Sequence, residues 1–333
     1  MKKLFIILVG WALGAPSIVW ACDICGCSSG AQTLGLLPLV QRHLAGVRWQ
    51  RQGYRTVAHG SEANSYEYFH SLDFWGRWMP HRRWQVMGFV PYSYNIRRFY
   101  DGQRQQVGGL GDVSLLAQFF ILDPHQSMTH RWRHALQVGA GVKLPTGDFW
   151  MSESLNGQEL PIPPALQPGT GSTDALVSAL YAVSTHEWII SVDGMLRLTG
   201  QNSEGYRFGS RANGTLRFFH VSLWRKVTWM PYVGAQLDYR GSDSFQGDLQ
   251  PETGGWVALA QVGAEVFAQD LAFGLSWSRP LAHELSSGFV APQGRFSVSV
   301  TILMGRRQTA PTVLPPIPLL FPNVQPDTKP TEQ

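Results

Sequence analysis

The feature that most constrains this chain is a repeated alternation of apolar and polar residues between positions 45 and 304. In the segment 295–303, Phe296, Val298, Val300 and Ile302 fall on one face, while arginine, serine and threonine fall on the other. A period of two residues is typical of a β-strand whose two faces meet different surroundings. About a dozen such segments follow one another, and none is convincingly helical. The sequence therefore predicts an all-β fold.

The first 21 residues have the character of a secretory signal peptide. Two lysines precede an apolar run too short to span a bilayer, and Val19-Trp20-Ala21, with small residues at positions 19 and 21, offers a cleavage site before Cys22. The remaining chain of about 312 residues is long enough for a barrel of 10 to 14 strands. Behind a signal peptide, alternating strands predict a transmembrane, antiparallel, up-and-down β-barrel.

The pattern predicts about 12 strands, and the connections between them predict which end faces the periplasm. With both termini in the periplasm, the connections on that side are mostly short, whereas those on the other side are longer and richer in Gly, Ser and Gln. This asymmetry is typical of outer-membrane barrels. The predicted strands are 44–56, 65–79, 83–99, 111–122, 132–145, 173–184, 187–200, 206–219, 227–240, 255–267, 270–281 and 293–304.

Aromatic residues near the strand ends support the same topology. Indole and phenol rings favour the two interfaces between membrane and water. Six tryptophans lie near the predicted periplasmic turns, and tyrosine or phenylalanine residues lie near the outer loops. The tryptophans are Trp78, Trp84, Trp132, Trp188, Trp224 and Trp229, and the outer aromatics are Tyr54, Tyr66, Phe99, Tyr100, Tyr206 and Tyr239.

Alternation also predicts which side chains line the lumen. An arginine at mid-bilayer costs roughly 2–4 kcal/mol, so the charged face of each strand must point inward. There the charges either pair and fill a narrow barrel or contribute to transport, and pairing is the simpler interpretation for any single residue. The predicted lumen residues are Arg48, Lys143, Asp193, Arg197, Arg207, Arg211, Arg217, Gln236, Asp238, Gln261 and Glu265.

The three cysteines of the chain are confined to one short motif near the predicted mature N-terminus. Cys22, Cys25 and Cys27 have the spacing C-x2-C-x-C, and thiolates at this spacing suit a soft ion such as Cu(I) or Zn(II). Two alternatives stay open. Two of the cysteines can form a disulfide, or Cys22 can carry a lipid, although Trp20 is bulky for a lipoprotein signal. No other cofactor is indicated.

These features divide the chain into four parts. They are the signal peptide at 1–21, a Cys-rich periplasmic segment at 22–43, the barrel at 44–304 and a proline-rich periplasmic tail at 305–333. Proline is excluded from sheet interiors, which separates the tail from the barrel. The net charge of +4 is mild and the basic residues are scattered, so nucleic acid is not an expected partner. The expected partners are outer-membrane lipid and a small solute.

Three glycine-rich stretches resemble a known family. They are G-L-G-D at 109–112, K-L-P-T-G-D at 143–148 and Q-P-G-T-G-S at 167–172. In order and spacing they are similar to the outer-membrane barrels assigned to transport in the phenol-degradation (meta-cleavage) pathway, and the N-terminus resembles a subgroup that begins C-x-x-C-G-C. The resemblance covers roughly residues 45 to 304 and implies a transporter-like barrel in the outer membrane of a Gram-negative bacterium.

Three functions remain after this reading of the sequence. The leading expectation is a porin-like, narrow channel for a small, apolar or aromatic solute, with the loop 146–172 deciding permeability. The alternative is a barrel that binds or handles copper through its N-terminal cysteines. The third is an outer-membrane lipid enzyme, but no G-x-S-x-G or H-E-x-x-H motif supports it, and we do not expect an enzyme.

Overall fold

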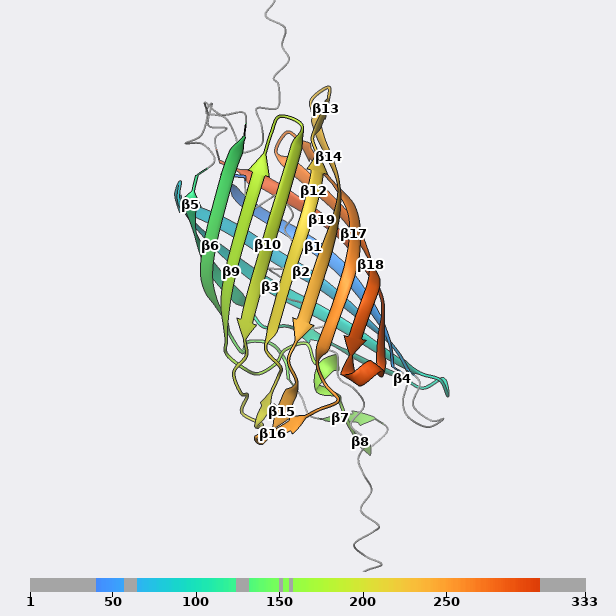
Figure 1. Ribbon diagram of the computed structural model, residues 1–333. Coiled ribbons are helices and arrows are strands. Elements are labelled where there is room, and N and C mark those ends of the chain that lie inside the picture. Colours follow the sequence, from blue (N-terminus) through green and yellow to red (C-terminus); the bar gives the residue numbers. More distant parts are fainter. Residues whose placement is uncertain (1–39, 57–64, 124–131, 150–151, 156–157, 306–333) are drawn as a thin grey trace, which may run out of the picture.

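Twelve antiparallel strands close into one barrel (Figure 1). The computed structural model describes residues 40–56, 65–123, 132–149, 152–155 and 158–305. Each wall strand pairs with the next along the chain, and β1 closes the ring against β19. The wall strands are β1 (His43–Thr56), β2 (Ser65–His81), β3 (Trp84–Phe99), β5 (Ser114–Leu122), β6 (Arg133–Lys143), β9 (Asp174–Ser184), β10 (Trp188–Leu198), β12 (Arg211–His220), β14 (Val227–Arg240), β17 (Gly255–Ala268), β18 (Leu271–Leu285) and β19 (Val290–Met304).

The predicted fold class is confirmed, and each predicted strand overlaps one wall strand. The first and last wall strands lie side by side with His43 opposite Met304, so the chain enters and leaves the wall at the same end. The fully described turns at this end are short, as between His81 and Trp84. At the opposite end lie the long connections that carry β7 (Ser152–Leu155), β8 (Gln158–Pro161), β15 (Asp243–Phe245) and β16 (Asp248–Gln250) (Figure 1). We call these the short-turn end and the long-loop end.

The outer surface of the wall is apolar and bounded by tryptophans. On β19 the side chains of Val298, Val300 and Ile302 are exposed, while Thr301 is fully buried on the other face. All six tryptophans predicted near the periplasmic turns are exposed, between 41% and 73%. The predicted outer set divides: Tyr100 and Tyr239 are exposed, whereas Tyr54 and Tyr206 are buried, so the expectation that these two lie at the interface is wrong. An apolar exterior with an aromatic girdle suits a bilayer.

Two departures from the predicted strands occur at the long-loop end. Residues 104–110, expected in a loop, form β4 (Arg104–Leu110), which extends the wall beside the outer half of β3. The predicted strand 206–219 is broken into β11 (Tyr206–Arg207) and β12. The break follows from Gly209, whose backbone packs so closely on Gly241 that a Cβ would lie 1.8 Å from the Gly241 carbonyl oxygen.

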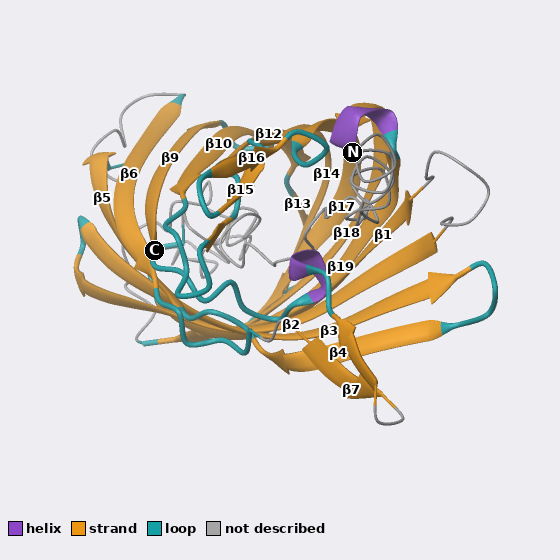
Figure 2. Cartoon of the chain, turned by 90° about the horizontal axis from the view of Figure 1, so that it is seen from below, coloured by secondary structure: helices purple, strands orange, loops and turns teal. Residues whose placement is uncertain are grey.

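No helix among the described residues has the length and apolarity to cross a membrane. Short 3-10 turns occur at η2 (Pro164–Leu166) and η3 (Ser286–Gly288). Viewed from the long-loop end, loop segments cross the barrel opening (Figure 2). The candidate functional site therefore comprises the lumen and these loop segments.

Candidate functional site: the barrel lumen and its outer mouth

Charged side chains in the lumen are paired with one another. Each pair joins a guanidinium to a carboxylate, and most of the side chains involved are buried. Such bonds are among the strongest that side chains make, because both partners are charged. Three of the pairs join neighbouring strands, and the fourth, Arg295–Asp238, reaches from β19 to β14 past two intervening strands, so together they fill the lumen. They are Arg48–Asp73 (2.6 Å), Arg97–Glu67 (2.7 Å), Arg217–Asp193 (2.6 Å) and Arg295–Asp238 (2.9 Å).

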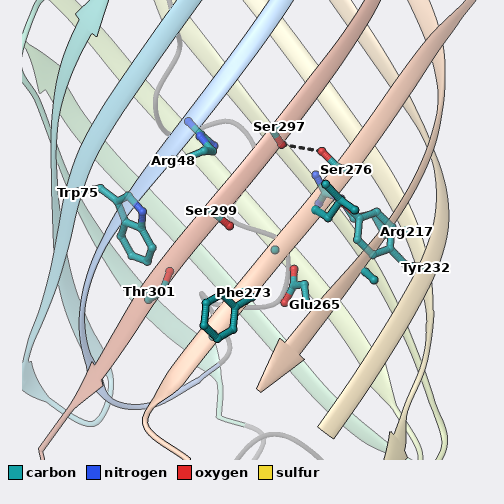
Figure 3. A pocket seen from close by; sticks show the side chains of 14 residues that line it. Arg48, Trp75, Arg217, Tyr232, Glu265, Phe273, Ser276, Ser297, Ser299 and Thr301 are labelled. Atoms are coloured by element: carbon teal, nitrogen blue, oxygen red, sulfur yellow. Dashed lines mark hydrogen bonds between the residues drawn. The ribbon is translucent and has the colours of Figure 1, made fainter. Parts of the chain in front are cut away.

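A small cavity lies beside two of these pairs (Figure 3). Its volume is about 40 Å³, and its lining includes Arg48, Arg217, Tyr232 and Glu265. A cavity of this size and polarity suits one or a few water molecules.

The three glycine-rich segments meet at Asp112. The carboxylate of Asp112 accepts hydrogen bonds from the backbone N–H groups of Gly147 (3.0 Å) and Thr170 (2.9 Å) and from Lys143 Nζ (2.5 Å). Lys143 Nζ also contacts Asp174 at 3.1 Å. Each of the three motifs thus contributes a side chain or a backbone N–H group to a single buried cluster.

The same cluster ties the long loop 144–173 to three wall strands. Arg197 of β10 contacts Asp174 at 2.6 Å, and Ser172 donates to the same carboxylate at 2.8 Å. Glycine is required at Gly147 and Gly169, where a Cβ would lie 2.6 Å and 2.7 Å from backbone atoms of the adjoining segment. These contacts hold both ends of the loop against the outer rim of the barrel.

The middle of this loop packs apolar side chains against the wall at the outer mouth. Ile162 and Leu166 are buried, and Asn95 of β3 donates to the carbonyl of Leu166 at 2.8 Å. Both side chains join an apolar cluster that lines the long-loop end of the lumen. Its other members are Tyr54, Phe69, Val107, Val257, Leu259, Leu285, Val290 and Phe289.

The predicted lumen residues on wall strands all lie on inward-facing positions. Arg211, near the outer end of β12, is only partly buried, and Asp193 and Asp238 are likewise half-buried. The others are buried. The inward-facing set is Arg48, Lys143, Asp193, Arg197, Arg211, Arg217, Gln236, Asp238, Gln261 and Glu265.

Arg207 does not line the lumen. It lies on β11, outside the wall, and its side chain is exposed. Its Nε donates to the carbonyl of Thr199 at 3.1 Å. The sequence pattern placed Arg207 on the same face as Arg211. This prediction is wrong, because the strand is interrupted between the two residues.

Sequence reasoning missed most of the acidic partners. Glu67 and Asp73 share the inward parity of β2, so alternation along that strand contains the signal for them. Asp174 and Asp243 stand at the ends of strands, where parity is hard to assign. Asp243 accepts hydrogen bonds from the Tyr206 hydroxyl (2.5 Å) and Arg240 (2.5 Å), and thereby fixes the loop that carries β15.

The three cysteines lie outside the described residues, and within the described part no cluster of three metal-binding side chains occurs. Metal binding at Cys22, Cys25 and Cys27 stays a prediction. Reduced protein is expected to retain copper or zinc that a triple Cys→Ser variant loses, because thiolates bind both ions strongly. Metal content measured after dialysis tests this. Equal, near-zero metal in both proteins would leave a disulfide or an acylated Cys22, which intact mass separates.

Comparison with solved structures places this architecture among known barrels. No protein-family model and no curated protein matches the chain. The crystal structure of the COG4313 outer membrane channel from Pseudomonas putida F1 superposes with a TM-score of 0.61 and 14% identity, covering 83% of this chain and 99% of that one. The fold is that of a bacterial outer-membrane β-barrel. The NanC porin (TM-score 0.39, 10% identity, 78% and 100% covered) and the CymD monoaromatic hydrocarbon channel (0.35, 8%, 81% and 90%) also match, too distantly to support an argument.

Proposed function

We propose that this barrel is a narrow channel in the Gram-negative outer membrane for a small, apolar or aromatic solute. The observation that carries the proposal is the outer mouth, where Ile162 and Leu166 of the docked loop pack on apolar wall residues. These side chains are buried, so they meet a solute only when the docked loop moves, and the path then opened is apolar, which favours apolar molecules. The three motifs at the loop's anchor are also those that resemble transporters of aromatic-compound pathways.

The ion pairs below the mouth give the channel its expected conductance. Paired guanidinium and carboxylate groups narrow the lumen, so the wild-type protein is expected to give small or intermittent currents in planar bilayers. A large steady conductance would contradict a channel narrowed by these pairs.

Replacing the apolar contacts of the loop tests the solute class. In the double variant Ile162→Ser/Leu166→Ser, uptake of radiolabelled toluene by intact cells is expected to fall several-fold, because the path that opens when the loop moves is then less apolar. Glucose entry into proteoliposomes serves as the polar counterpart and is expected to stay low or rise.

The matched control is Leu249→Ser, which changes an exposed leucine on β16 that lies outside the apolar cluster at the mouth. It is expected to leave toluene uptake unchanged. Equal uptake by the double variant, the control and the wild type would contradict an apolar solute path through this mouth.

A further inference from the structure

The outward face of the wall carries a patch of arginines at the long-loop end. The β-sheet register places Arg55 of β1 opposite Tyr66 of β2, Tyr66 opposite Arg98 of β3, and Arg98 opposite Arg104 of β4. All three arginines are exposed. The row crosses three strand spacings, about 14 Å, and is therefore wide enough to contact more than one phosphate.

Arg51 extends this row toward the membrane. It lies on the outward face of β1, exposed, with its guanidinium 4.8 Å from the centre of the Tyr68 ring. We call Arg51, Arg55, Arg98 and Arg104 the outer arginine patch. By contrast, the outward faces of β9, β10, β12 and β14 carry no arginine, lysine or acidic residue.

The height of the row formed by Arg55, Arg98 and Arg104 matches the outer edge of the bilayer. On β2, Tyr66 lies twelve residues before the girdle residue Trp78. At about 3.3 Å per residue and a tilt of about 45°, this separation is roughly 28 Å along the barrel axis, slightly more than the apolar band of about 25 Å. The row of arginines therefore lies where headgroups of the outer leaflet begin.

The arginines of the patch have no carboxylate partner within the described part of the chain. Arg98 and Arg104 repel each other, because like charges directly opposite on neighbouring strands destabilise a sheet. Asp101 in the adjoining turn accepts a hydrogen bond from the backbone of Gln103 at 2.9 Å. An external anion would reduce the repulsion between Arg98 and Arg104. In the lumen, carboxylates already pair with Arg48, Arg97, Arg217 and Arg295.

We propose that the outer arginine patch binds the phosphate groups of a glycolipid in the outer leaflet. Guanidinium groups bind phosphate through two parallel hydrogen bonds, and the tyrosines between them suit the interface at which such headgroups lie. The apolar face of β1 to β3 below the row meets the acyl chains. The ligand class is a phosphorylated saccharide lipid.

The test measures stabilisation of the refolded, full-length protein in detergent. Lipid A bearing two phosphates is expected to raise the unfolding midpoint of the wild type by roughly 2–4 °C, since it binds only the folded barrel. The same lipid A after phosphatase treatment, and inorganic phosphate at equal concentration, are expected to raise it much less. This comparison uses the wild-type protein alone and measures its unfolding midpoint. Its outcome therefore does not depend on whether the barrel conducts.

The double variant Arg98→Gln/Arg104→Gln is expected to need about tenfold more bisphosphorylated lipid A for the same shift, because it loses two charge-assisted contacts. The control Arg225→Gln/Lys226→Gln removes two exposed basic residues from a turn at the short-turn end and is expected to match the wild type. Equal responses from both double variants, or equal stabilisation by dephosphorylated lipid, would overturn the proposal. An equal shift with free phosphate would overturn the assignment to a lipid.

Discussion

Replacing Asp112 with alanine is expected to raise the conductance of the channel several-fold. Asp112 accepts hydrogen bonds from the backbone at Gly147 and Thr170 and from the Lys143 ammonium. Each hydrogen bond to a charged group contributes about 1.5–3 kcal/mol, and the Asp112 carboxylate accepts such bonds from both of the other segments, including two from loop backbone N–H groups. Without it the loop 144–173 is expected to leave the mouth for much of the time.

Single-channel recording in planar bilayers measures this effect. The control is Asp248→Ala, which removes an exposed carboxylate from β16 of another loop and should leave the current unchanged. Lys143 keeps Asp174 as a partner in the Asp112→Ala variant, so the barrel itself is expected to fold. Identical currents from the two variants would show that this cluster does not hold the loop in a blocking position.

Replacing Arg217 with methionine is expected to lower the free energy of unfolding by about 3–5 kcal/mol, the usual cost of breaking a buried ion pair from one side. Arg217 donates to Asp193 at 2.6 Å and to Gln261 at 3.1 Å. Its removal leaves Asp193 in the lumen without its guanidinium partner. Denaturant titration of the barrel in lipid vesicles measures the change.

The double variant Arg217→Met/Asp193→Leu separates loss of the pair from loss of one charge. It is expected to recover most of the lost stability, because apolar residues of similar volume replace a buried pair at little cost. The exposed Arg225 provides the control Arg225→Met, which should change stability by less than about 0.5 kcal/mol. If Arg217→Met were as mild as this control, the pair would contribute little to holding the strands.

Strand alternation allowed the sequence to predict the wall and its two faces. Arg48, Arg217 and Glu265 were assigned to the lumen because a charge is too costly in hydrocarbon, and that cost acts on each residue wherever its strand lies. The same argument failed at Arg207, because parity can be carried only along an unbroken strand. The break there comes from the close contact of Gly209 with Gly241, 32 residues away in sequence.

The partners within the lumen and the position of the long loop were decided by tertiary structure. A period of two fixes which face a residue occupies, but not which residue of the next strand lies beside it; that depends on register, on turn length and on breaks such as those at β4 and β11. The sequence determined a barrel with a polar lumen, an apolar exterior and three glycine-rich motifs. Only the closed barrel brought those motifs together at Asp112 and set Arg98 opposite Arg104, because both arrangements join segments that touch only once the strands have paired.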